Sequence, residues 1–226
     1  MTIELSPVSR KSKKTPDKRP AGSPDPREAE VHIIGGTFRG RRLEYHGDPT
    51  VRPMKHRTRE SLFNLIGTEC GGCHAIDLFG GTGALGLEAL SRGAVRATFI
   101  EKHVPSSRVI EANIRLLGVE DRTNLCVTSA FVWAKRDLEP AAADGVPWLV
   151  FCSPPYVFFR DREEEMLDLI NRIRTHSPVG TILLVEAEDP FDFDLLRGDP
   201  SGEEYQAWDV RSYAPAVVGV RRDPRK

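Results

Sequence analysis

Apolar residues along the chain follow two alternating spacings. Some form short, nearly continuous runs of strand length, such as 148–152, whereas others recur three or four positions apart, as Met166, Ile170 and Ile173 do. The first pattern is typical of strands buried on both faces of a parallel sheet, and the second of amphipathic helices. The alternation therefore predicts repeated strand–helix units.

Such units predict an α/β fold with a mostly parallel sheet and helices on both of its faces. Ligands of these sheets bind at the carboxyl ends of the strands, near the point where the strand order reverses. We expect strands at 75–79, 97–100, 125–128, 148–152 and 181–186, and helices at 58–68, 84–91, 131–138, 162–174 and from Pro105 onward.

Further segments precede and follow these units. Residues 31–36 and 41–45 predict a small N-terminal hairpin, and 205–213 with 217–220 predict a terminal antiparallel pair. Residues 1–30 are rich in proline and in charges of both signs, with almost no apolar clustering. This composition predicts a disordered tail.

Basic residues gather in one part of a chain whose formal net charge is only −1. A local basic stretch on an otherwise acidic body is the pattern expected for phosphate contact, although a solvated surface is the alternative reading. We interpret 31–70 as a basic, substrate-binding extension of one domain at 31–226. The candidate nucleic-acid-binding residues are Arg39, Arg41, Arg42, Arg52, Lys55, Arg57 and Arg59.

Composition argues against several other classes of protein. No apolar run approaches the roughly 18 residues of a membrane span, and the first residues lack the apolar core of a signal peptide. The four cysteines include Cys70 and Cys73, but a zinc site would need a second pair, so we expect no metal. Sparse cysteine use fits a reducing cytoplasm, which is the predicted location.

The segment 77–86 reads Asp-Leu-Phe-Gly-Gly-Thr-Gly-Ala-Leu-Gly and lies between a predicted strand and a predicted helix. Glycines let a ligand approach the backbone at a helix N-terminus, and Glu101, 20 residues after Gly81, is placed to accept hydrogen bonds from ribose hydroxyls. This much also fits a nicotinamide dehydrogenase or a purely structural turn. Asp77 would repel a pyrophosphate but would accept a hydrogen bond from a methionine ammonium, which favours S-adenosylmethionine.

Ser153-Pro154-Pro155-Tyr156 follows the apolar run 148–152. An exocyclic purine amine is a poor nucleophile, because its lone pair is delocalised into the ring, and it must be oriented towards a methyl donor. The Ser153 side chain and the Pro154 carbonyl would accept the two amino hydrogens, while the prolines fix the turn. Tyr156 offers a ring on which the base can stack. A Pro-Pro loop without a chemical role is the alternative.

Four segments form a more specific pattern. They are Ile33-Ile-Gly-Gly with Arg39-Gly-Arg, Arg59-Glu-Ser-Leu-Phe-Asn64, the glycine segment 77–86, and Ile100-Glu101. Together they resemble the bacterial RsmD family of 16S ribosomal RNA guanine-N2 methyltransferases. The glycine segment is common to many methyltransferases, whereas the first two segments are more specific to this family. The resemblance covers about 31–222.

The resemblance implies a Rossmann-like class I methyltransferase fold, with a seven-stranded, mostly parallel sheet and a terminal antiparallel hairpin. It implies an enzyme that uses S-adenosylmethionine, without metal, to methylate N2 of a guanine in 16S ribosomal RNA, free or in the small subunit. We expect the enzyme to be a monomer. The implied catalytic residues are Ser153, Pro154, Pro155 and Tyr156. The implied cofactor-binding residues are Asp77, Phe79, Gly80, Gly81, Gly83, Glu101, Lys102, Ser129 and Ala130.

Three positions depart from the family pattern. Ser153 and Ser129 each stand where Asp or Asn is usual, and Met54-Lys55-His56 stands where Thr-Thr-Asp is usual. These departures keep two alternatives open. One is a methyltransferase of the same fold that acts on another amino group, in DNA, other RNA or protein. The other is an RNA-binding or ribosome-assembly factor that has lost catalysis.

Overall fold

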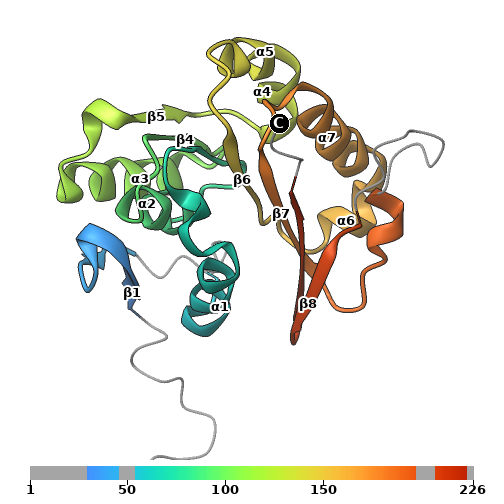
Figure 1. Ribbon diagram of the computed structural model, residues 1–226, viewed down its shortest axis with the longest axis horizontal. Coiled ribbons are helices and arrows are strands. Elements are labelled where there is room, and N and C mark those ends of the chain that lie inside the picture. The colour runs from blue at the N-terminus through green and yellow to red at the C-terminus, as the bar shows by residue number, and fades with distance from the viewer. Residues whose placement is uncertain (1–29, 46–53, 197–206, 223–226) are drawn as a thin grey trace, which may run out of the picture.

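The computed structural model describes residues 30–45, 54–196 and 207–222 and shows a central sheet with helices on both sides (Figure 1). The tail predicted at 1–30 lies almost wholly outside the described residues, as does Arg52. No helix in the described ranges is long and apolar enough to cross a membrane.

The main sheet has seven strands in the order β5–β4–β3–β6–β7–β9–β8. The strands from β5 to β7 pair in parallel, and β9 pairs antiparallel with both β7 and β8. This order confirms the predicted sheet with its terminal hairpin, and it reverses between β3 and β6. The strands are β3 (His74–Asp77), β4 (Arg96–Ile100), β5 (Thr123–Cys126), β6 (Trp148–Cys152), β7 (Ile182–Glu188), β8 (Asp209–Tyr213) and β9 (Ala216–Arg222).

Helices cover both faces of the sheet and give it two separate cores (Figure 1). Helices α1, α2 and α3 pack on one face, and α4, α5 and α7 on the other. Strand β6 serves both, since Leu149 and Phe151 join the first core and Trp148 and Val150 the second. The helices are α1 (His56–Ile66), α2 (Ala84–Ser91), α3 (Val104–Leu117), α4 (Ala130–Arg136), α5 (Leu138–Ala142), α6 (Phe158–Asp161) and α7 (Glu163–His176).

Most predicted elements differ from the structure by one or two residues at an end. The strand expected at 125–128 begins two residues earlier, because β5 is an edge strand whose side chains are only partly buried. The helix expected at 131–138 ends at Arg136, and α5 begins only at Leu138. The short strand and turn expected at 31–36 are β1 (Val31–His32) and the residues that lead into the short helix η1 (Gly36–Phe38), across which β1 pairs with β2 (Arg42–Leu43).

A buried carboxylate on α2 explains why β1 is short. Glu88 is 0% exposed and accepts hydrogen bonds from the amides of Ile34 at 2.7 Å and Gly35 at 2.8 Å. Those amides therefore pair with a side chain instead of a neighbouring strand. Nε of Arg92, one helical turn further on, donates to the same carboxylate at 2.7 Å. Glu88 thus anchors the N-terminal hairpin to the domain.

Asn113 on α3 provides a second anchor for the hairpin. Its Oδ1 accepts from the amide of Glu44 at 2.6 Å, and its Nδ2 donates to the carbonyls of Glu44 at 3.1 Å and Thr82 at 3.0 Å. Thr82 lies in the glycine turn that precedes α2. The side chain of Asn113 is fully buried, so one amide group joins the hairpin to this turn.

We predict that Glu88→Ala destabilises the protein strongly. The substitution leaves two buried amides unpaired and removes the counter-charge of Arg92, which should lower the free energy of unfolding by about 3–5 kcal/mol. Urea titration followed by circular dichroism measures the loss. Glu111→Ala is the control, because Glu111 forms only an exposed pair with Arg115, and it should cost less than about 1 kcal/mol. Equal losses in both variants would show that Glu88 is not an anchor.

Candidate active site

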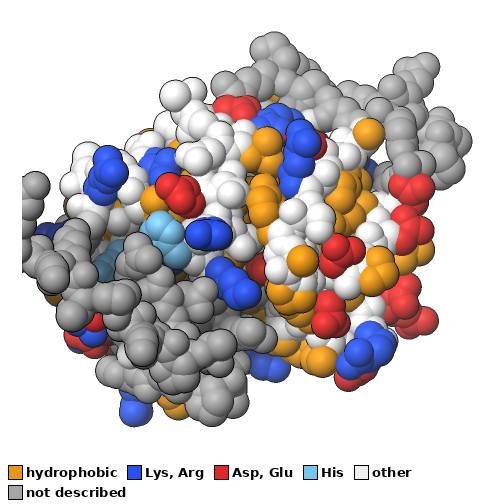
Figure 2. All heavy atoms as spheres, turned by 90° about the horizontal axis from the view of Figure 1, so that it is seen from below, with side chains coloured by type: hydrophobic (Ala, Val, Ile, Leu, Met, Phe, Trp, Pro, Cys, Tyr) orange, Lys and Arg blue, Asp and Glu red, His pale blue; other side chains and the backbone are white. Residues whose placement is uncertain are grey.

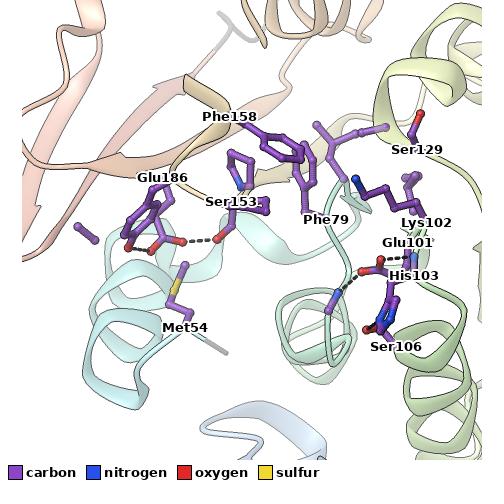
Figure 3. A pocket seen from close by; sticks show the side chains of 18 of the residues that line it. Met54, Phe79, Glu101, Lys102, His103, Ser106, Ser129, Ser153, Phe158 and Glu186 are labelled. Carbon is purple, nitrogen blue, oxygen red and sulfur yellow. Dashed lines mark hydrogen bonds between the residues drawn. The ribbon is translucent and has the colours of Figure 1, made fainter. Parts of the chain in front are cut away.

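A cavity of about 530 Å³ opens at the carboxyl ends of β3, β4 and β6, where the strand order reverses. Loops that follow β3, β4 and β5 line one side, and the turn after β6 lines the other (Figure 3). Met54 and Thr58 at the start of α1 and Tyr213 of the terminal hairpin complete the lining. A cavity of this size suits a cofactor or a small-molecule ligand.

The glycine segment forms the turn between β3 and α2. Gly81 and Gly83 have φ values of 54° and 78°, in the left-handed region that residues with side chains rarely adopt. The amide of Gly83 donates to the carbonyl of Gly80 at 2.7 Å and closes the turn. Gly81 borders the cavity, whereas Gly80 and Gly83 are buried and shape the turn without lining it.

Glu101 lies just after β4 and faces the cavity from the side of the glycine turn (Figure 3). Its two carboxylate oxygens accept from the amides of Gly81 at 2.9 Å and His103 at 2.7 Å. These bonds fix the carboxylate while each oxygen keeps a free lone pair. The group can therefore still accept hydrogen bonds from two adjacent hydroxyls of a ribose.

Asp77 is the last residue of β3 and is 1% exposed. One carboxylate oxygen accepts weakly from the amide of Gly86 at 3.4 Å, and the other is buried with no hydrogen-bond partner among the described residues. Burial raises the pKa of Asp77 from its usual 3.8 to about 7. Because Asp77 does not itself line the cavity, its contact with a cofactor stays a prediction.

Aromatic side chains form one wall of the cavity. The ring of Phe79 lies 6.4 Å from that of Phe131 and 6.1 Å from that of Phe158. Two cations cover this cluster: Nζ of Lys102 lies 5.2 Å from the Phe158 ring, and the guanidinium of Arg162 lies 4.2 Å from the Phe131 ring. The wall offers an apolar, aromatic surface against which a base could pack.

Ser129 and Ala130 lie next to this wall at the start of α4, and both border the cavity. The Ser129 hydroxyl caps the helix by accepting from the amide of Val132 at 3.2 Å. Helix capping therefore explains this serine without a ligand, and its predicted contact with adenine stays a prediction.

The turn 153–156 lies on the opposite side of the cavity from Glu101 (Figure 3). The hydroxyls of Ser153 and Tyr156 both hydrogen-bond to the carboxylate of Glu186, and the Tyr156 bond is 2.9 Å long. Glu186 comes from β7, the strand beside β6, and is 7% exposed. The sequence analysis missed this residue. An acid within the otherwise apolar run 182–187 was the signal that could have found it.

The predicted basic residues fall into three groups. Arg39, Lys55 and Arg57 are exposed, and Lys55 also borders the cavity. Arg41 and Arg42 are also exposed but have partners: Arg41 donates to the carbonyl of Leu116 at 2.7 Å, and Arg42 pairs with Glu30 at 3.0 Å. The remaining described residue, Arg59, is buried.

The prediction that Arg59 contacts nucleic acid is wrong, because its side chain is 2% exposed. Its Nη2 donates to the carbonyl of His32, which ties α1 to β1. Burial lowers the pKa of Arg59, and the nearby carboxylate of Glu88 opposes this shift. Arg59 therefore supports the hairpin from beneath and lies on the same helix face as Leu62 and Phe63.

Comparisons with known proteins identify the family to which this chain belongs. The family described as "Conserved hypothetical protein 95" matches residues 31–193. Ribosomal RNA small subunit methyltransferase D of Haemophilus influenzae is 31% identical over 77% of this chain and 91% of its own. Its counterpart from Escherichia coli K12 is 37% identical over 62% of this chain and 67% of its own. The putative rRNA methyltransferase YlbH of Bacillus subtilis is 31% identical over 73% and 85%.

The chain belongs to this methyltransferase family. A solved structure titled putative methyltransferase yhhF, from Escherichia coli, is similar with a TM-score of 0.65 and 26% identity, over 87% of this chain and 99% of that one. An RNA methyltransferase from Salinibacter ruber, in complex with S-adenosyl-L-homocysteine, shares the fold with a TM-score of 0.50 and 15% identity, over 77% and 95%. Family and fold together identify an S-adenosylmethionine-dependent methyltransferase.

The cavity fits this cofactor chemically. Glu101 keeps lone pairs for the ribose hydroxyls, and the aromatic wall offers a surface for the adenine. Asp77 has an unpartnered oxygen of the kind that would accept from the methionine ammonium, but Asp77 lies behind the cavity lining, so this contact stays a prediction. Membership of a methyltransferase family rules out the alternative of a nicotinamide dehydrogenase. The chemistry of the cavity is consistent with this conclusion.

We predict that Glu101→Ala weakens binding of S-adenosylhomocysteine by on the order of 2–4 kcal/mol, because two hydrogen bonds to a charged acceptor are lost. Isothermal titration calorimetry measures the change. Glu120→Ala, on an exposed turn after α3, is the matched control and should bind as the wild type does. Equal affinity of the Glu101 variant and the wild type would remove Glu101 from the binding site.

We also predict that Asp77→Asn changes the pH dependence of stability. A carboxyl whose pKa rises from 3.8 to about 7 on folding favours the folded state fully below pH 3.8, and this contribution is lost as the pH rises through 7. The variant should therefore gain on the wild type by roughly 2–3 kcal/mol between pH 5 and pH 8. Urea titrations at both values measure it. Asp121→Asn, at an exposed position, is the control and should show no such gain. If the free energy of unfolding of Asp77→Asn changed with pH as that of the wild type does, a raised pKa of Asp77 would be ruled out.

Proposed function

We propose that this chain transfers a methyl group from S-adenosylmethionine to the exocyclic N2 amine of a guanine in 16S ribosomal RNA, free or within the small subunit. We further propose that it acts as a monomer in the cytoplasm. Relatives named as small-subunit ribosomal RNA methyltransferases support the choice of RNA. The observation that carries the choice of an amine is that Ser153 and Pro154 line the same cavity as Glu101.

Two acceptors at the turn after β6 would orient the amine. The hydroxyl of Ser153 is hydrogen-bonded to Glu186, so its oxygen still has a lone pair for one amino hydrogen. No backbone hydrogen bond in the described part of the chain uses the carbonyl of Pro154, which is therefore available for the other. With both hydrogens held, the nitrogen lone pair would point in a fixed direction.

The remaining contribution of the chain is positioning. The cofactor supplies a methyl group on a positively charged sulfur, which is already activated for transfer. The bond from Tyr156 to Glu186 fixes the tyrosine ring, on which the guanine would stack. Pro154 is buried and the aromatic wall is apolar, so both would limit the contact of a bound base with water.

The RNA is proposed to approach over the start of α1. Seen from below, Lys and Arg side chains lie near the middle of this face of the molecule, and acidic side chains lie towards its right-hand edge (Figure 2). Lys55 and Arg57 are both exposed, and Lys55 borders the cavity. Phosphates held here would bring a neighbouring nucleotide to the turn 153–156.

Tritium transfer from labelled S-adenosylmethionine tests the proposal. Ribosomal RNA and small subunits lacking this methylation should both be tried as acceptors, followed by nucleoside analysis. Label in N2-methylguanosine is the expected result. Label in another nucleoside, in DNA or in protein would identify a different amino group as the acceptor. No transfer to any acceptor, with RNA binding retained, would favour an assembly factor without catalysis.

We predict that reversing two exposed charges weakens RNA binding. In Lys55→Glu/Arg57→Glu, the slope of log affinity against log salt should become shallower by about 1.4, the value for two lost contacts to single-stranded RNA. Fluorescence anisotropy with a labelled RNA fragment measures it. The matched control is Lys135→Glu/Arg172→Glu on α4 and α7, which should keep the wild-type slope. An unchanged slope in the first variant would mean that Lys55 and Arg57 face only solvent.

A further inference from the structure

Three side chains from two neighbouring strands form a hydrogen-bonded group at the cavity. Ser153 and Tyr156 follow β6, Glu186 lies on β7, and the pairing of Cys152 with Val185 places Ser153 beside Glu186. One carboxylate oxygen of Glu186 accepts a hydrogen bond from the Ser153 hydroxyl, and the other accepts one from the Tyr156 hydroxyl at 2.9 Å. All three residues line the cavity, and Ser153 and Glu186 are labelled in Figure 3.

The direction of these hydrogen bonds follows from chemistry. An ionised carboxylate has no proton to donate, so both hydroxyls must donate to Glu186. The oxygen of Ser153 then presents only lone pairs to the cavity. Since Glu186 is 7% exposed, its charge polarises this hydroxyl in a largely water-excluded place, which makes the serine oxygen a stronger acceptor.

We propose that Glu186 is the positioning and proton-accepting residue for methyl transfer, and that it acts through Ser153. The inference rests on the proposed function, because it assigns the proton that an amine must lose on methylation. A serine alone is a weak acceptor for that proton. Glu186 supplies from β7 the negative charge that Ser153 lacks.

The step balances as follows. The nitrogen lone pair forms a bond to the methyl carbon, and the carbon–sulfur bond breaks with its electron pair passing to sulfur, which becomes neutral. The nitrogen then carries the positive charge and gives one proton to the oxygen of Ser153. The Ser153 hydroxyl proton moves to Glu186, which becomes a neutral carboxyl. The positive charge of the sulfonium thus ends as a proton that neutralises the carboxylate of Glu186.

Relocating the carboxylate tests the inference. Single-turnover methyl transfer to RNA, with saturating cofactor, would be compared in the wild type, Glu186→Gln, Ser153→Asp and the double variant. Glu186→Gln should be about a hundredfold slower, as for loss of a proton acceptor. Ser153→Asp should also be slow, because two adjacent carboxylates in a buried site cannot both ionise. The double variant has one carboxylate again and should recover to within about tenfold of the wild type.

Affinity for S-adenosylhomocysteine and RNA should stay near wild type in all four proteins, so that only the rate changes. Glu188→Gln is the matched control: it lies two residues along β7, is exposed, and should keep the wild-type rate. A wild-type rate in Glu186→Gln, or a folded double variant no faster than the single variants, would overturn the inference. If Glu186→Gln does not fold, the double variant decides alone. A wild type that transfers no methyl group to RNA would overturn the proposed function instead, and the inference with it.

Discussion

The parallel pairing of β3 with both β4 and β6 is the constraint on which the site depends. Because all three strands run in the same direction, their carboxyl ends meet at one edge of the sheet. The chain therefore delivers the glycine turn, Glu101 and the turn 153–156 to one cavity although they are far apart in sequence. The chemistry of each segment matters only because this pairing brings them face to face.

Much of this arrangement is readable from the sequence. Strands buried on both faces leave continuous apolar runs, which located β3, β4, β6 and β7 to within two residues. The glycine turn and Glu101 follow directly from their position after such strands. Strand β5 was predicted two residues too late at both ends, because it lies at the sheet edge, where partial burial weakens the pattern and leaves Val127, just beyond it, 55% exposed.

The rest depends on contacts between distant segments, which a linear pattern does not contain. Glu88 and Glu186 are single acids within apolar stretches, and the sequence shows that they are unusual but not which donors they meet. Arg59 was grouped with its basic neighbours by proximity in sequence. Its spacing from Leu62, Phe63 and Ile66 places it on the buried face of α1. The helical periodicity of the sequence therefore indicates that Arg59 is buried, whereas its charge alone does not.

The side-chain amide of Asn113 couples the N-terminal hairpin to the glycine turn of the site. It holds Glu44 of the N-terminal hairpin and Thr82 of the glycine turn at once, from a fully buried position. A turn made more rigid by a bound cofactor would limit the motion of the hairpin through this shared partner. Thermodynamic reciprocity then requires that a ligand which limits the motion of the hairpin raises the affinity of the turn for the cofactor by the same factor.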